Sequence, residues 1–188
     1  MKPGLLERFY ETQLERGFDT VQPVIERLIG YFSTISGPAD QVVHLYAFDS
    51  LDDWQTRLHG LYGLPELEPY FLKVRPLMLS QENHILLPAP LPALTPHFSA
   101  DSSWIPSDPP LADPTTVRNL LIEEQIVSLA PGMLGKYWEL LERHGISALT
   151  PLETNMIGSF FMMAGPLHQV YHYWFFDSFD DRTRRHNA

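Results

Sequence analysis

Residues 41–53 read QVVHLYAFDSLDD, and nearly the same string, QVYHYWFFDSFDD, occupies residues 169–181. The two strings begin at residues 41 and 169. The same spacing aligns the preceding residues without a gap as far back as Pro3-Gly4, which matches Pro131-Gly132. About twenty identities in this ungapped register indicate an internal repeat. We therefore interpret the chain as one module that occurs twice, and we call the two occurrences copy one and copy two.

Each copy is predicted to begin with an amphipathic helix. Apolar residues recur at helical spacing between Leu5 and Gly17, and a matching stripe runs from Met133 to Gly145. Two strand-like runs with a short Gly-Pro loop between them follow in each copy and predict a β-hairpin. These runs are residues 28–35 and 41–48 in copy one, and residues 156–163 and 169–176 in copy two.

The Asp-Ser pairs at 49–50 and 177–178 are suited to cap a further helix in each copy. That helix opens with two acids, at 52–53 or 180–181, where negative charge favours the helix dipole. We interpret these acids as structural.

Pooling the two copies gives the order strand, helix, strand, strand, helix, strand, which is the ferredoxin-like unit. Copy one continues through helical stretches to a strand at 84–87, and copy two is preceded by a strand at 120–129. We predict an α+β protein of tandem ferredoxin-like modules that form an α+β barrel. Its parts are a module at 1–90 without the first strand, a Pro-rich linker at 91–115, and a module at 116–188 without the last strand.

The composition narrows the class of protein. With 44% apolar and 19% charged residues, the chain can bury a core, and it contains no apolar run near the ~20 residues of a membrane helix. A net charge of -10 disfavours binding to nucleic acid. With no cysteine and no signal-peptide pattern, we expect a cytoplasmic protein without disulfides.

The strings in copy one resemble the central signature of NIPSNAP domains. The resemblance rests on RLIGYF at 27–32, Gly37-Pro38, the string at 41–53, and KVRP at 73–76 with QEN at 81–83. It covers most of residues 2–90 and, more loosely, 117–188. It implies ferredoxin-like sheets that pair face to face into an α+β barrel, either between two chains of a homodimer or between the two copies as a pseudo-dimer.

Proteins of that fold include cofactor-free monooxygenases and enzymes that degrade or isomerise small molecules, while many NIPSNAP-like proteins have no assigned activity. The resemblance therefore leaves two classes of function open. One is a cofactor-free small-molecule enzyme, oxygenase-like or isomerase-like, that acts on an apolar or aromatic substrate in the barrel cleft. The other is a non-enzymatic binding or scaffold protein that uses the barrel as an association surface.

The candidate site lies on the second strand of each hairpin. Because strand side chains alternate, His44 and Tyr46 share one face, as do His172 and Trp174, and we assign this face to the barrel interior. An imidazole titrates near neutrality, so His44 and His172 are candidate general bases or hydrogen-bond donors. The candidate substrate-binding residues around them are Tyr46, Trp174, Phe32, Phe160 and Tyr31. The alternative is that both histidines are core residues satisfied by a neighbour.

Cofactor and metal motifs are missing from the sequence. It contains no Gly-x-Gly-x-x-Gly, Walker loop or Gly-x-Ser-x-Gly, and no His-Glu-x-x-His. His168 and His172 stand four apart, but this spacing does not converge on a turn and strand as it would on a helix. We therefore expect neither a cofactor nor a metal.

Overall fold

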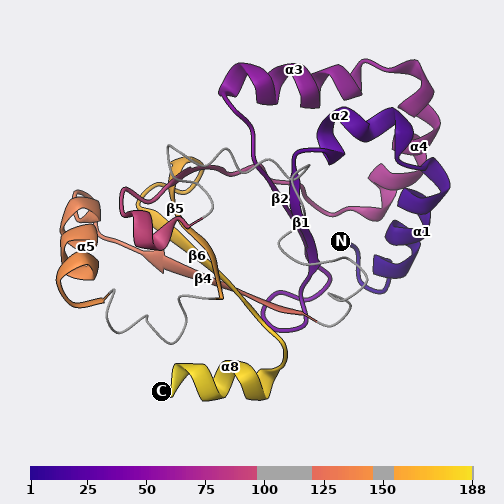
Figure 1. Ribbon diagram of the computed structural model, residues 1–188. Helices are drawn as coiled ribbons and strands as arrows, with labels where there is room; N and C mark the ends of the chain where they lie inside the picture. Colours follow the sequence, from indigo (N-terminus) through magenta and orange to yellow (C-terminus); the bar gives the residue numbers. More distant parts are fainter. Residues whose placement is uncertain (97–119, 146–154, 188) are drawn as a thin grey trace. The chain divides into compact units, whose positions relative to one another are not determined.

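The computed structural model describes residues 1–96, 120–145 and 155–187, and within them the chain is α+β with antiparallel sheets (Figure 1). It divides into two compact units. The first spans Met1–Glu82, and the described part of the second begins at Asn83. Most of the predicted Pro-rich linker, from 97 to 115, lies outside the described residues. None of the helices in the described ranges is long and apolar enough to cross a membrane.

The first unit surrounds a two-stranded hairpin with helices. Its elements are α1 (Leu6–Arg16), α2 (Gln22–Ile25), β1 (Leu28–Ser33), β2 (Val42–Tyr46), α3 (Leu51–Tyr62) and α4 (Glu68–Val74). Helix α1 packs beside α4, as Figure 1 shows. Gln13 Nε2 donates to Tyr70 Oη at 2.6 Å, and the Arg16 guanidinium lies 4.8 Å from the centre of the Tyr70 ring.

The second unit contains a four-stranded antiparallel sheet in the order β3-β5-β6-β4 (Figure 1). Its elements are β3 (Ile85–Pro88), β4 (Leu121–Ser128), α5 (Leu134–Leu140), β5 (Met156–Ala164), β6 (Gln169–Phe176) and α8 (Phe179–His186). Strand β3 was predicted at the end of copy one, yet it pairs with β5 of copy two. A strand from the first module thus completes the sheet of the second unit.

The two hairpins have the same pairing register. Tyr31 pairs with His44 in the first unit, and Ser159 pairs with His172 in the second, which is the same pairing shifted by the repeat offset. Each hairpin also has an irregularity just before a glycine, between 28 and 30 or between 156 and 158. Asp40 and His168, which correspond in the repeat, both have positive φ, at 55° and 64°. The hairpin backbones of the two copies therefore correspond residue by residue.

The core of the second unit lies between the sheet and α5. Val170, Trp174 and Phe176 of β6 are buried in one cluster with Trp138 of α5. The row that contains His172 therefore faces the helix, and its assignment to the barrel interior was wrong. The physical reason is that the apolar stripe of α5 needs an apolar partner face, whereas the other row of β6 carries the hydroxyl groups of Tyr171 and Tyr173.

Candidate functional site

The imidazole of His172 is held between two hydroxyl groups from different elements. The Ser159 Oγ atom, on β5, lies 2.6 Å from His172 Nδ1. The Tyr137 Oη atom, on α5, lies 2.8 Å from His172 Nε2. Strand pairing places Ser159 opposite His172, and the helix stripe turns Tyr137 toward the sheet. We call these three side chains the His172 network.

The network is buried at its centre and reaches solvent at one end. His172 is 3% exposed and Ser159 is fully buried, while Tyr137 is partly exposed. Burial lowers the pKa of His172 to about 4, so its imidazole is neutral at pH 7. Burial also raises the pKa of Tyr137, which keeps its hydroxyl protonated. The network can therefore donate or relay a proton without carrying a net charge.

Trp174 completes one side of this arrangement. Its ring stacks on the His172 imidazole with centroids 5.5 Å apart and planes inclined by 25°. Trp174 is 3% exposed, and its indole Nε1 has no hydrogen-bond acceptor within the described structure. A buried donor without an acceptor is uncommon in folded proteins, and it marks a place where a water or a ligand atom can bind.

The corresponding positions of copy one hold a different set of side chains. By the repeat offset, Tyr137 corresponds to Phe9, and Ser159 corresponds to Tyr31. His44 stacks on Tyr31 with centroids 3.9 Å apart, and although the residue as a whole is exposed, burial of its imidazole lowers its pKa to about 4, as in His172. In the part of the chain that the structure describes, neither ring nitrogen of His44 has a hydrogen-bond partner, and the buried Tyr31 hydroxyl has none either. Copy one therefore has the histidine but not the network.

The other predicted substrate-binding residues are divided between the two faces of each sheet. Tyr46 lies on the His44 face, with ring centroids 6.1 Å apart. Phe32 pairs with Val43 and Phe160 pairs with Tyr171, so both phenylalanines lie on the opposite face from the histidines. The predicted wall of Tyr46, Trp174, Phe32 and Phe160 is therefore not one surface. The reason is strand alternation on β1 and β5, which separates neighbours such as Tyr31 and Phe32.

Sequence reasoning missed the two hydroxyl partners of His172. Ser159 is the one hydroxyl residue in the apolar run 156–163, and this break in the run was the available signal. Tyr137 belongs to the helix stripe that was interpreted only as packing. The contact of both residues with His172 depends on the hairpin register and on the helix packing against that face, neither of which was predicted.

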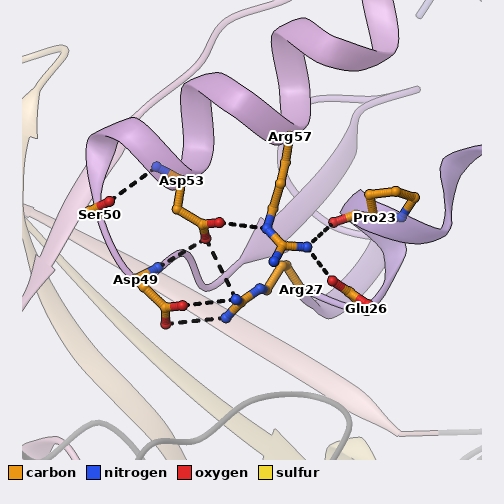
Figure 2. Close-up of polar contacts among 7 residues, drawn as sticks. All are labelled: Pro23, Glu26, Arg27, Asp49, Ser50, Asp53 and Arg57. Atoms are coloured by element: carbon orange, nitrogen blue, oxygen red, sulfur yellow. Dashed lines mark hydrogen bonds and ion pairs between the residues drawn. The ribbon is translucent and has the colours of Figure 1, made fainter.

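The acidic motif after β2 forms a separate polar cluster in the first unit (Figure 2). Ser50 Oγ caps α3 by accepting from the Asp53 backbone N–H at 3.0 Å, which confirms the predicted cap. The buried Arg27 guanidinium donates to both carboxylate oxygens of Asp49, at 3.2 and 2.8 Å. Arg57 donates to Asp53 Oδ1 at 2.6 Å and also to Glu26. These contacts tie the helix start to the hairpin, as expected of structural acids.

Copy two has the same cap without the buried cation. Ser178 Oγ accepts from the Asp181 backbone N–H at 3.1 Å. Asn155 occupies the position that corresponds to Arg27, and its Nδ2 donates to the Phe175 carbonyl oxygen at 2.7 Å. The cap is therefore shared by both copies, and so is the ion pair of Arg57 with Asp53, which recurs as Arg185 with Asp181, whereas the Arg27–Asp49 pair has no counterpart among the described residues of copy two. Across the described ranges, no group of three or more His, Asp or Glu side chains is placed to hold a metal ion.

Comparison with known proteins identifies the family. Two solved structures share 35% and 36% identity with the chain: an uncharacterized NIPSNAP-like domain protein from Burkholderia xenovorans and a NIPSNAP family protein from Agrobacterium tumefaciens str. C58. Both have TM-scores of 0.35 and are matched over 37% of this chain and 60% of their own. A second NIPSNAP family protein of unknown function from A. tumefaciens is 29% identical, with a TM-score of 0.34, over 37% of this chain and 62% of its own.

The chain thus spans less than two thirds of the length of these three relatives. No match is found among curated proteins. The NIPSNAP family model matches residues 1–92 and 122–188, which is most of the 188 residues. Of the two hairpin strings quoted above, the one at 41–53 lies in the first matched range and the one at 169–181 lies in the second. By this match over both copies, the protein belongs to the NIPSNAP family.

Proposed function

We propose that the second unit is a small-molecule site centred on His172, and that it binds an apolar or aromatic compound without a cofactor. As an enzyme it would be isomerase-like, because the His172 network offers hydrogen-bond donation and proton relay. The α+β barrel, formed by the two modules within one chain or between two chains, stays part of the proposal, but the site lies on the helix side of the sheet and not in the barrel cleft.

The observation that carries this proposal is the difference between the His172 network and the side chains at the corresponding positions of copy one. The two hairpins share register and irregularity, yet copy one accommodates Phe9 and Tyr31 where copy two has Tyr137 and Ser159. The backbone therefore does not require these hydrogen bonds. A buried polar network offers less stability than apolar packing unless every group is satisfied, so its presence supports a role beyond folding.

The chemistry of the network favours isomerase-like over oxygenase-like activity. The neutral imidazole of His172 joins two hydroxyl groups, and such a chain can donate a hydrogen bond to a carbonyl oxygen where negative charge develops. Such a donor stabilises the enol or enolate that forms when a solvent base removes the α-proton of a ketone, and return of a proton from solvent completes the isomerisation. Trp174 and Trp138 are packed in the core behind the network, so an aromatic ring would be bound beside the partly exposed Tyr137.

The experiment compares ligand binding in matched histidine variants. Thermal unfolding is measured with a panel of aryl ketones and phenols for the wild type, His172→Gln and His44→Gln. We expect at least one compound to raise the melting temperature of the wild type and of His44→Gln, and to have no effect on His172→Gln. The proposal is wrong if binding survives in His172→Gln, or if no compound of the panel binds the wild type.

A second candidate function is association through a sheet edge. Strand β4 is eight residues long and has one neighbour, β6, among the described strands, so its other edge presents backbone groups that can pair with a further strand. Ile126 on this strand is 47% exposed. A homodimer or scaffold role predicts a dimeric mass by light scattering that Ile126→Lys reduces, whereas a monomeric wild type contradicts it.

A further inference from the structure

The hydrogen bonds around His172 have a direction that can be worked out by counting protons. A neutral imidazole has one N–H donor and one acceptor nitrogen. Both nitrogens of His172 lie within hydrogen-bond distance of a hydroxyl oxygen, Ser159 Oγ at 2.6 Å and Tyr137 Oη at 2.8 Å. One hydroxyl must therefore donate to the ring and the other must accept from it. The accepting hydroxyl still has its own proton, which needs a further acceptor.

Burial decides which hydroxyl accepts. Ser159 is fully buried, and within the described structure its Oγ has no partner other than His172. If Ser159 accepted from the ring, its proton would point into the core with no acceptor, and a buried unsatisfied donor destabilises the fold. Tyr137 is partly exposed, so its remaining proton can reach a group outside the core. The favoured arrangement has Ser159 donating to Nδ1, and Nε2–H donating to Tyr137.

We propose that Tyr137 is the ligand-contacting residue of the site, and that its hydroxyl donates to an oxygen acceptor, a carbonyl, of an apolar or aromatic ligand. Ser159 and His172 are then positioning residues, because they orient this donor from behind. The inference rests on the proposed function and deepens it by naming the ligand class. The indole N–H of Trp174, stacked on the same imidazole, is a second buried donor here without an acceptor among the described residues, as the Tyr31 hydroxyl is beside His44.

Copy one explains why the site is confined to the second unit. Its counterpart of Tyr137 is Phe9, which has no hydroxyl, and His44 therefore has no donor to orient. Phe9 also shows that the helix position accepts a phenylalanine without loss of the hairpin register. Tyr137→Phe is thus a variant that removes the hydroxyl and is expected to fold.

The first measurement determines the tautomer of His172 by ¹⁵N NMR of the imidazole nitrogens in the protein without ligand. The His172→Gln spectrum assigns the signals. We expect the proton on Nε2 in the wild type and in Tyr137→Phe. A proton on Nδ1 in the wild type overturns the proposed direction, whatever the ligand results are.

The second measurement compares two probes of similar shape, acetophenone, which has a carbonyl oxygen, and cumene, which does not. Tyr137→Phe should weaken acetophenone binding by roughly 2- to 10-fold, the range of one neutral hydrogen bond, and should leave cumene binding unchanged. Tyr10→Phe, which removes a phenol hydroxyl from α1, is the matched control and should bind both probes as the wild type does.

The outcomes separate this inference from the proposed function. Equal acetophenone affinity in the wild type and in Tyr137→Phe overturns Tyr137 as the donor, and indicates that a water alone accepts its proton, while the site itself stands. If Nε2 carries the proton but neither probe binds the wild type, the ligand assignment and the proposed function fail together. Loss of cumene binding in Tyr137→Phe also overturns the inference, because cumene has no oxygen to accept from Tyr137.

Discussion

Acid should destabilise the second unit through His172. The buried imidazole has a pKa of about 4 in the folded protein against an ordinary value of 6.5, so between these pH values the unfolded chain binds a proton that the folded chain does not. Stability is therefore retained above pH 6.5 and lost as the pH falls toward 4. Each pH unit in this window is worth about 1.4 kcal/mol, so lowering the pH from 7 to 5 should remove about 2 kcal/mol.

Urea unfolding at pH 7 and pH 5, followed by tryptophan fluorescence, measures this loss. Other groups also titrate in this range, so the quantity of interest is the difference between the wild type and His172→Gln. The wild type should lose about 2 kcal/mol more than the variant. His59→Gln, at an exposed histidine of α3, is the control and should lose as much as the wild type, because His172 is still present. If His172→Gln loses as much as the wild type, the imidazole is not held neutral, and the description of the network is wrong.

Three further substitutions test single contacts by their free energies of unfolding in urea. Ser159→Ala leaves His172 Nδ1 buried without its donor and should cost about 1 to 3 kcal/mol, and a neutral result would show that Ser159 is not bonded to the ring. Asp49→Ala removes the bidentate partner of the buried Arg27 and should cost about 2 kcal/mol. The control, Asp52→Ala, changes an exposed residue and should cost no more than about 0.5 kcal/mol. Equal costs for the two variants would show that the Arg27–Asp49 ion pair does not stabilise the fold. Ser50→Ala should cost about 1 kcal/mol through loss of the α3 cap, and no change in stability would contradict the capping bond.

Local features of the fold could be predicted from the sequence because they depend on neighbouring residues. The hairpins at 28–46 and 156–176 follow from two apolar runs around a Gly-Pro loop, and the helix starts follow from Ser50 and Ser178. The repeat supports these predictions, since the same pattern of residues occurs in both copies. The correspondence extends to the pairing register, which was not predicted in detail but is the same in both hairpins.

Features that depend on distant residues were harder to predict. The pairing of β3 with β5 joins segments that lie far apart along the chain, and nothing local in Ile85–Pro88 specifies this partner. The sheet face toward α5 was misassigned, because strand alternation separates the two faces without showing which of them packs against the aromatic stripe of α5. The His172 network was missed for the same reason, since Tyr137 reaches the imidazole only once that face is known.

The central claim is that two equivalent hairpins support one ligand site, at His172 and not at His44. A crystal structure of the protein with acetophenone tests this most directly. We predict density for the ketone at the partly exposed side of Tyr137, with its oxygen within hydrogen-bond distance of Tyr137 Oη and nothing at His44. Ketone density at His44 would contradict the account. So would a crystal saturated with acetophenone in which only water lies beside His172 and Tyr137.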